Sequence, residues 1–237
     1  MLLWLIPLII GLIAFVVFSI FRVRQQRVIA VWIKGFVSLM FILTGILGFI
    51  FSNNPHSSFG IFILIGLFFG LLGDVFLDLK YISLKHTFLF TTLGFIAFTL
   101  GHACYVTGLL LNFFDFSRNP LFVIIPGIIA ILLTIITLLM EKLSQIKYGK
   151  MKPFVILYGL VLFFTVPIYF STSIQSGWQY VTLTIISISL VFFALSDLIL
   201  NNTYFASGFD GPLFIVLNHS LYYIAQFAIA VSLFFLV

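Results

Sequence analysis

Charged side chains are scarce in this chain. Only 7% of its 237 residues are Asp, Glu, Lys or Arg, whereas an ordinary soluble domain has about 25%. Hydrophobic residues make up 63%, so there is too little polar surface to cover a water-soluble globule. This composition excludes a soluble enzyme, a nucleic-acid-binding protein, a secreted disulfide scaffold and a disordered chain. The sequence therefore predicts a polytopic membrane protein.

Cysteine is almost absent as well. The single cysteine, Cys104, allows no internal disulfide and no cysteine-rich metal site. The net charge of +5 comes from basic residues scattered over short loops. That distribution is typical of membrane topology and gives no indication of nucleic-acid binding.

Long apolar runs, by contrast, are abundant. A run of more than about 18 apolar residues marks a transmembrane helix, and eight such runs predict an all-α transmembrane bundle that forms one domain over residues 1–237. The predicted spans are residues 3–21, 28–51, 59–79, 88–111, 120–140, 153–170, 179–200 and 212–236. The first span lacks a basic leader region and a small-residue cleavage site, so we expect it to remain as a helix.

Lysine and arginine set the expected orientation. The connections after spans one, three and five carry nine of these residues, whereas those after spans two, four and six carry only Arg118. The nine are Arg22, Arg24, Arg27, Lys80, Lys85, Lys142, Lys147, Lys150 and Lys152. Basic loops stay in the cytoplasm, so we expect both termini on the non-cytoplasmic side. If the chain is bacterial, we expect the protein in the cytoplasmic membrane.

Five ionisable residues fall inside the predicted spans: Lys34, Asp74, Asp78, His102 and Asp197. Each costs about 2.5–3.5 kcal/mol or more at a helix centre, so such groups persist where they pair, line a cavity or take part in chemistry. Asp74 and Asp78 are four residues apart and share one helix face. Asp78 and Asp197 lie near span ends. For Asp78 the simpler interpretation is a carboxylate that reaches the membrane interface, and for Asp197 an interfacial helix cap is an open alternative.

The last predicted span carries a polar stripe. His219, Tyr222, Tyr223 and Gln226 are spaced as i, i+3, i+4 and i+7, so they share one helix face. Such a face turns towards protein or water rather than lipid. If the helices converge, these residues and the buried charges form a pocket for a single-chain amphiphile, with its head in the polar mouth.

These residues resemble those of the YhhN-type lysoplasmalogenases, eight-span membrane proteins that include the mammalian enzyme. Separate segments match the family's motifs in order over most of the chain; residues 120–170 match poorly, and Gly35 stands where the family usually has proline. The matching residues are Lys34; Gly73-Asp74; Gly94, Phe98, His102 and Tyr105; Phe193, Ser196 and Asp197; and Tyr222, Tyr223, Gln226 and Ser232. Asp78 and His219 fall outside the pattern, which lowers both as site candidates.

The resemblance implies hydrolysis of the vinyl-ether bond of a lysoplasmalogen, giving a fatty aldehyde and a glycerophospho-ethanolamine or -choline. That chemistry needs an acid for the β-carbon, a base for water and a negative field for the cation. We predict Asp74 and Asp197 as the carboxylate pair, with their roles open, and His102 as a proton shuttle. The predicted substrate-binding residues are Lys34, Tyr105, Ser196, Tyr222 and Gln226. Lys34 would bind the phosphate or shift the pKa of a carboxylate.

The implied partners are a lysophospholipid substrate and the membrane lipids, with no metal, cofactor or nucleic acid; a homodimer is compatible with the sequence. Two other functions stay open. A zinc hydrolase of the alkaline-ceramidase kind would use His102 and His219 with Asp74 or Asp197. A proton-coupled carrier would use the buried charges as a relay, although no Gly/Pro-broken helix repeats in the two halves.

Overall fold

The computed structural model describes residues 2–54, 57–117, 119–143, 146–206, 208 and 211–237. The described residues form helices and no strand, and eight of the helices are long and apolar enough to cross a membrane. The predicted all-α bundle is therefore confirmed. The α-helices are α1 (Leu5–Val23), α2 (Arg27–Ile50), α3 (Ser58–Leu79), α4 (Thr87–Asn112), α5 (Leu121–Leu143), α6 (Lys152–Gln175), α7 (Val181–Phe205) and α8 (Pro212–Ser232). Three short 3-10 helices are η1 (Leu84–His86), η2 (Gly149–Met151) and η3 (Leu233–Phe235).

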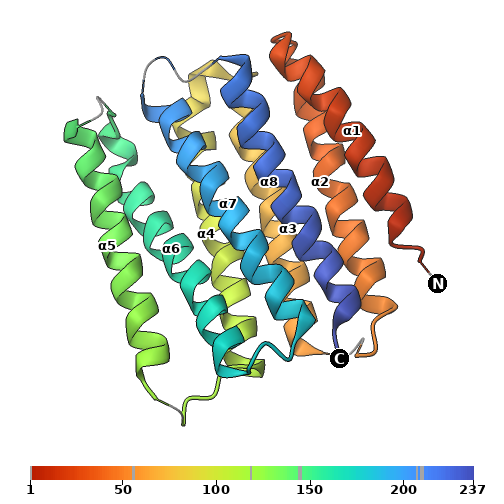
Figure 1. Cartoon of the computed structure of the whole chain (residues 1–237). Helices are drawn as coiled ribbons and strands as arrows, with labels where there is room; N and C mark the ends of the chain where they lie inside the picture. The colour runs from red at the N-terminus through yellow and green to blue at the C-terminus, as the bar shows by residue number, and fades with distance from the viewer. Residues whose placement is uncertain (1, 55–56, 118, 144–145, 207, 209–210) are drawn as a thin grey trace.

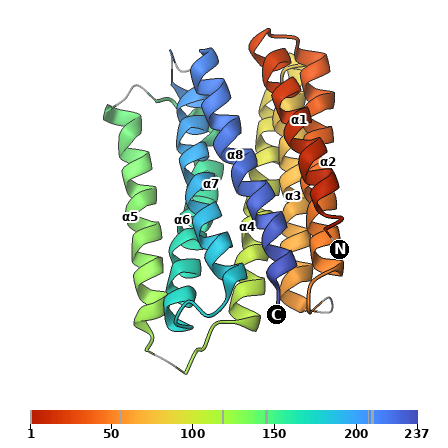
Figure 2. The same cartoon turned by 45° about the vertical axis from the view of Figure 1, so that its right-hand side comes forward.

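Consecutive helices run antiparallel (Figure 1), and most of them pack as neighbours, most extensively α3 on α4 and α7 on α8; α4 packs on α6 rather than on α5. Figures 1 and 2 show α1 and α5 at opposite edges, with α3, α4, α7 and α8 between them. The connections α1–α2, α3–α4, α5–α6 and α7–α8 lie at one end, the upper end in Figure 1, and we call this the basic end. Arg118 lies outside the described residues. Which side of a membrane the basic end faces stays a prediction.

Small residues bring the central helices close together. Gly66 of α3 faces Gly101 of α4, where an added Cβ would lie 3.1 Å from the carbonyl oxygen of Gly66. Gly70 of α3 faces α8, and a Cβ there would lie 2.5 Å from Nε2 of Gln226. Lipid-embedded helices associate through such close contact because lipid gives no hydrophobic force between them. The glycines therefore place α4 and α8 directly against α3.

The helices α6 and α7 extend furthest beyond their predicted ends. α6 continues to Gln175 rather than residue 170, and α7 continues to Phe205 rather than residue 200. The polar residues that suggested loops are accommodated within the helices. Thr172 Oγ1 donates to the carbonyl of Ile168, and Asn202 Nδ2 donates to that of Leu198. Side chains that bond the carbonyl four residues back remain compatible with a helix.

Proline inside α5 is compensated by α6. Pro126 has no N–H to give to the carbonyl of Phe122, one turn earlier. Ser171 Oγ of α6 donates to that carbonyl at 2.6 Å. Neighbouring side chains satisfy freed backbone groups in this way inside membranes, so Ser171 fastens α6 to α5 although its polarity had suggested a loop.

Candidate functional site

A polar cavity of about 220 Å³ opens at the basic end. Residues from α1, α2, α3, α4, α7 and α8 form its wall. The polar and charged side chains of the wall are Arg22, Gln25, Arg27, Lys34, Asp74, Asp78, Tyr81, Ser196, Asp197, Thr203, Tyr204, Asn218, His219 and Tyr222. Helices far apart in sequence thus converge on one cavity, as the polar residues of the spans predicted.

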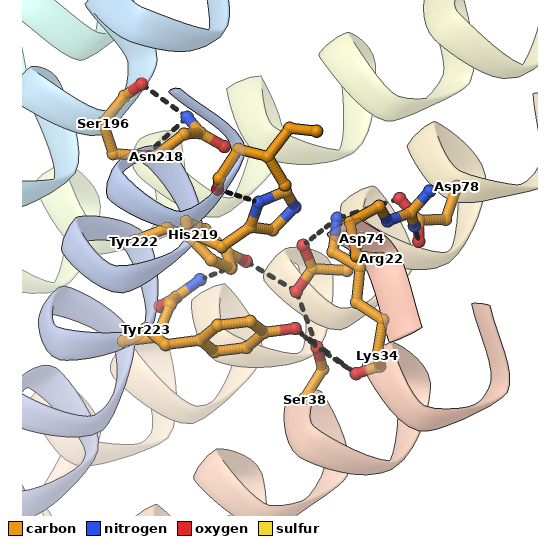
Figure 3. Close-up of polar contacts among 12 residues, drawn as sticks. Arg22, Lys34, Ser38, Asp74, Asp78, Ser196, Asn218, His219, Tyr222 and Tyr223 are labelled. Carbon is orange, nitrogen blue, oxygen red and sulfur yellow. Dashed lines mark hydrogen bonds and ion pairs between the residues drawn. The ribbon is translucent and has the colours of Figure 1, made fainter. Parts of the chain in front are cut away.

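Asp74 is the centre of a hydrogen-bonded network (Figure 3). Its Oδ1 lies 3.2 Å from the ammonium of Lys34, while Oδ2 accepts hydrogen bonds from Ser38 Oγ at 2.6 Å and Tyr222 OH at 2.8 Å. The carboxyl group is 2% exposed. A buried carboxylate is tolerated where a cation and hydrogen-bond donors replace its water. α2 and α8 together therefore supply the Asp74 carboxyl group with a cation and two hydroxyl donors.

Asp78 belongs to the same network. Its carboxylate pairs with the guanidinium of Arg22 and lies 3.2 Å from Lys34 Nζ. The interface position expected for Asp78 is wrong, because the residue is 2% exposed and paired inside the bundle. Two cations, Arg22 and Lys34, thus balance two carboxylates, Asp74 and Asp78.

Arg22 departs most from the sequence expectation. It was counted among the loop cations, but it lies in α1 and is 7% exposed. Its guanidinium lies over the rings of Phe18 and Tyr81, 5.4 and 4.6 Å from their centroids. Cation–π contact of this kind stabilises a desolvated guanidinium. Nothing in the sequence distinguishes Arg22 from its neighbours Arg24 and Arg27.

Asp197 has different surroundings. It lies on α7, on the cavity wall, and accepts a hydrogen bond from the phenol of Tyr158 on α6. In the part of the chain that the structure describes, no Lys or Arg forms an ion pair with Asp197. Its neighbour Ser196 accepts hydrogen bonds from Asn218 Nδ2 of α8, at 2.6 Å to the carbonyl and 3.4 Å to Oγ. This contact fixes α7 against α8 beside Asp197.

Tyr105 and Gln226 are linked to the cavity without lining it. Tyr105 OH donates to Gln226 Oε1 at 3.4 Å, and Gln226 Nε2 donates to Tyr222 OH at 2.9 Å. Tyr222 in turn donates to Asp74. A chain of hydrogen bonds therefore runs from Asp74 into the bundle, and Tyr105 and Gln226 orient Tyr222 rather than face the cavity.

His102 lies outside this network. It is 1% exposed, and neither ring nitrogen has a hydrogen-bond partner among the described residues. Its ring packs edge-on against Phe193, with centroids 4.7 Å apart. Phe193 contacts Phe98 and Tyr222, which line the cavity. The aromatic side chains thus lie between the histidine and the cavity.

His219, which the family pattern left out, does line the cavity, with Nδ1 2.7 Å from the carbonyl oxygen of Ile215. Four further participants were missed: Ser38, Tyr158, Asn218 and Arg22. The sequence did contain a signal for Ser38, since it lies one turn after Lys34 on the same face.

Across the described residues, no group of three or more His, Cys, Asp or Glu is arranged to hold a metal ion. The zinc hypothesis therefore finds no ligand set there.

A further basic residue, Lys80, lies beside the wall of the cavity. Lys80 follows α3 and lies over the ring of Tyr204, which is on the cavity wall. Burial lowers the pKa of the Lys80 ammonium well below its usual value, and the positive charges of Lys34 and Arg22 lower that pKa further. An anionic group at the rim would relieve this repulsion between cations.

The model of the YhhN family matches residues 29–233. The chain belongs to the YhhN family. This is the lysoplasmalogenase family. No curated protein and no solved structure matches the chain. The YhhN match takes in Lys34, Asp74, Asp78 and Asp197 and begins after Arg22, so one ion pair of the network joins the matched part of the chain to an arginine that precedes it.

Proposed function

We propose that this YhhN-family protein hydrolyses the vinyl-ether bond of a lysoplasmalogen, with Asp197 as general acid and Asp74 as the fixed negative charge. One observation carries the proposal: of the carboxyl groups that line the cavity, Asp74 and Asp197 have different partners. Asp74 has a cation and two hydroxyl donors, whereas Asp197 has a neutral phenol. Paired carboxyl groups in unlike environments divide acid and base roles in this way.

The first step is proton transfer to carbon. The carboxylic acid of Asp197 gives its proton to the β-carbon of the vinyl ether, and the electron pair of the double bond forms the new C–H bond. The positive charge that results is shared between the α-carbon and the ether oxygen. Asp74, whose charge cannot move away, stabilises that cation electrostatically. Tyr158 positions the acid through its hydrogen bond to Asp197.

Water completes the reaction. A cavity of about 220 Å³ has room for water beside a substrate group. A water molecule adds to the α-carbon and returns a proton to the Asp197 carboxylate, which gives a hemiacetal. That hemiacetal collapses when Asp197 gives its proton to the ether oxygen, the C–O bond breaks, and the hemiacetal hydroxyl returns its proton to the Asp197 carboxylate as the carbonyl forms. The products are a fatty aldehyde and the glycerophospho head group, and the acid is restored.

Head-group recognition falls to Arg27 rather than to Lys34. The ammonium of Lys34 already contacts both Asp74 and Asp78. Arg27 lines the cavity, is exposed, and forms no ion pair with any carboxylate of the described chain. A guanidinium binds phosphate through a fork of two hydrogen bonds, so Arg27 fits the phosphodiester at the mouth of the cavity.

The test is aldehyde release by the purified protein in lipid nanodiscs. The substrate is lysoplasmenyl-ethanolamine, and the control is the saturated 1-alkyl analogue, which has no double bond to protonate. Aldehyde from the first lipid only, in proportion to protein, is the expected result. Absence of aldehyde from both ethanolamine and choline vinyl-ether lipids would overturn the proposal. Proton-coupled uptake into proteoliposomes would then be measured, because the buried charges would also suit a carrier.

A further inference from the structure

The polar cavity is too small to hold a whole lysophospholipid. Its volume of about 220 Å³ is below the roughly 300–1,000 Å³ of pockets that enclose drug-sized ligands. A single-chain amphiphile that places its head group there must therefore lay its alkyl chain elsewhere.

A second, apolar space lies between α5, α6 and α7. It measures about 790 Å³, and none of its described lining residues is charged. Its polar lining residues are Asn119, Thr137 and Ser171. The hydroxyl groups of Thr137 and Ser171 already donate to backbone carbonyls of α5. We call this space between α5, α6 and α7 the lipid-side groove. Its surface is therefore almost entirely hydrocarbon.

A third space of about 50 Å³, which we call the connecting space, lies between the two and has lining residues in common with both. It shares Asp197, Leu200 and Tyr204 with the polar cavity, and Thr137, Phe163, Ala194 and Leu198 with the groove. Tyr158, the hydrogen-bond partner of Asp197, also lines it. The proposed acid thus lies where the polar cavity gives way to the apolar groove. A lysoplasmalogen has its vinyl ether at the corresponding point, between head group and chain.

The groove has the length and the opening that a chain needs. It follows α5 from Leu121 to Thr137, which is about 24 Å of helix at 1.5 Å per residue. The hydrocarbon layer of one leaflet is about half of the roughly 30 Å total thickness, so the groove is long enough for an alkyl chain from one leaflet. Ile125 and Ile136 of α5, which line the groove, are 50% and 53% exposed. A chain could therefore enter sideways from the surrounding lipid.

We propose that the lipid-side groove binds the alkyl chain of the single-chain substrate, and that the connecting space at Ala194 sets how that chain passes Asp197. This inference rests on the proposed function for the identity of the head group. It commits to one occupant, the chain covalently attached to the group in the polar cavity. Nonspecific filling by bilayer lipid is the opposing outcome.

The first test maps the chain without requiring catalysis. The probe is a 1-alkyl lysophosphatidylethanolamine with a diazirine at the end of its chain, photolysed with the protein in nanodiscs and located by peptide mass spectrometry. We expect adducts on residues 121–137 of α5 and 163–174 of α6 that unlabelled 1-alkyl lipid removes by competition. Labelling of exposed α1 should resist competition, as should labelling by a diacyl phosphatidylcholine probe. Equal competition everywhere, or adducts confined to helices other than α5, α6 and α7, overturns the inference.

The second test fills part of the connecting space with a larger side chain. Ala194→Phe places a ring in the connecting space, whereas Ile188→Phe changes a 50% exposed position on the same helix. We expect kcat/KM for a long-chain vinyl-ether substrate to fall about tenfold with Ala194→Phe, the equivalent of about two lost methylene contacts. A short-chain substrate and the Ile188→Phe control should stay within about twofold. Equal losses on both chain lengths contradict the inference.

The two proposals fail separately. Competed adducts in the groove without aldehyde release would support the chain site and overturn the hydrolase proposal. Aldehyde release with adducts elsewhere would leave the hydrolase proposal intact and overturn the chain site.

Discussion

The surroundings of Asp74 and Asp197 differ although both carboxyl groups face one cavity. Around Asp74, α2, α3 and α8 pack closely, and both carboxyl oxygens are occupied by Lys34, Ser38 and Tyr222. Around Asp197, the carboxyl group accepts a hydrogen bond from the phenol of Tyr158 on α6, and the walls of two spaces meet. The larger set of partners belongs to Asp74, which the proposed mechanism keeps as a fixed charge, and the smaller set belongs to Asp197, which we propose exchanges a proton.

The largest expected effect is on catalysis at Asp197. Asp197→Asn keeps a hydrogen-bond acceptor for Tyr158 but has no acidic proton, so aldehyde release should fall by about 10²–10⁴-fold, the usual contribution of a general acid. Thermal unfolding in nanodiscs should stay close to that of the wild type, because no ion pair is lost. Full activity in the folded variant would remove Asp197 from the mechanism.

Asp74→Asn should act mainly on stability. The substitution leaves Lys34 buried with only Asp78 to balance it, while Arg22 also requires that carboxylate. Breaking a buried pair by removing one partner costs about 3–5 kcal/mol. We expect a clearly lower midpoint of unfolding, together with lost activity, measured by intrinsic fluorescence in the same nanodiscs. A midpoint equal to that of Asp197→Asn would abolish the contrast between the two regions.

A double-mutant cycle sharpens that result. Lys34→Met combined with Asp74→Asn removes the cation together with the anion, so the double variant should be more stable than the two single losses predict. The coupling should lie in the range of about 0.5–3 kcal/mol that contacting residues show. Strict additivity would mean that the 3.2 Å contact between Lys34 and Asp74 contributes nothing measurable.

Two tyrosine variants compare the regions directly. Among the described residues, Tyr158→Phe removes the one hydrogen-bond donor of Asp197, whereas Tyr222→Phe removes one of three partners of Asp74. A hydrogen bond to a charged or ionisable group contributes about 1.5–3 kcal/mol. We therefore expect kcat to fall roughly tenfold or more for Tyr158→Phe and by less for Tyr222→Phe. The reverse order would place the proton donor in the Asp74 network instead.

The sequence was sufficient for the fold and for the principal carboxylates. Apolar runs locate eight membrane-spanning helices, and the cost of a buried charge selects Lys34, Asp74 and Asp197, all of which line one cavity. The sequence did not identify residues whose role depends on a contact with another helix. Arg22 looks like any loop arginine until Asp78 of another helix lies beside it. Tyr158, on a helix where the family resemblance is poor, acquires meaning only through contact with Asp197.

Substitution of His102 has the smallest expected effect on aldehyde release and stability, and it tests whether sequence spacing alone identifies a proton shuttle. Its spacing to Tyr105 predicted a proton shuttle, yet its ring nitrogens have no partner in the described chain and its ring packs among Phe193, Tyr105 and Tyr158. Replacing an unbonded buried polar group with an apolar one of similar shape is close to neutral. His102→Phe should therefore keep aldehyde release within about twofold and leave stability unchanged or higher. A tenfold loss of activity in a folded variant would instead show that bound water connects His102 to Asp197, and the acid would then be a pair of groups rather than one.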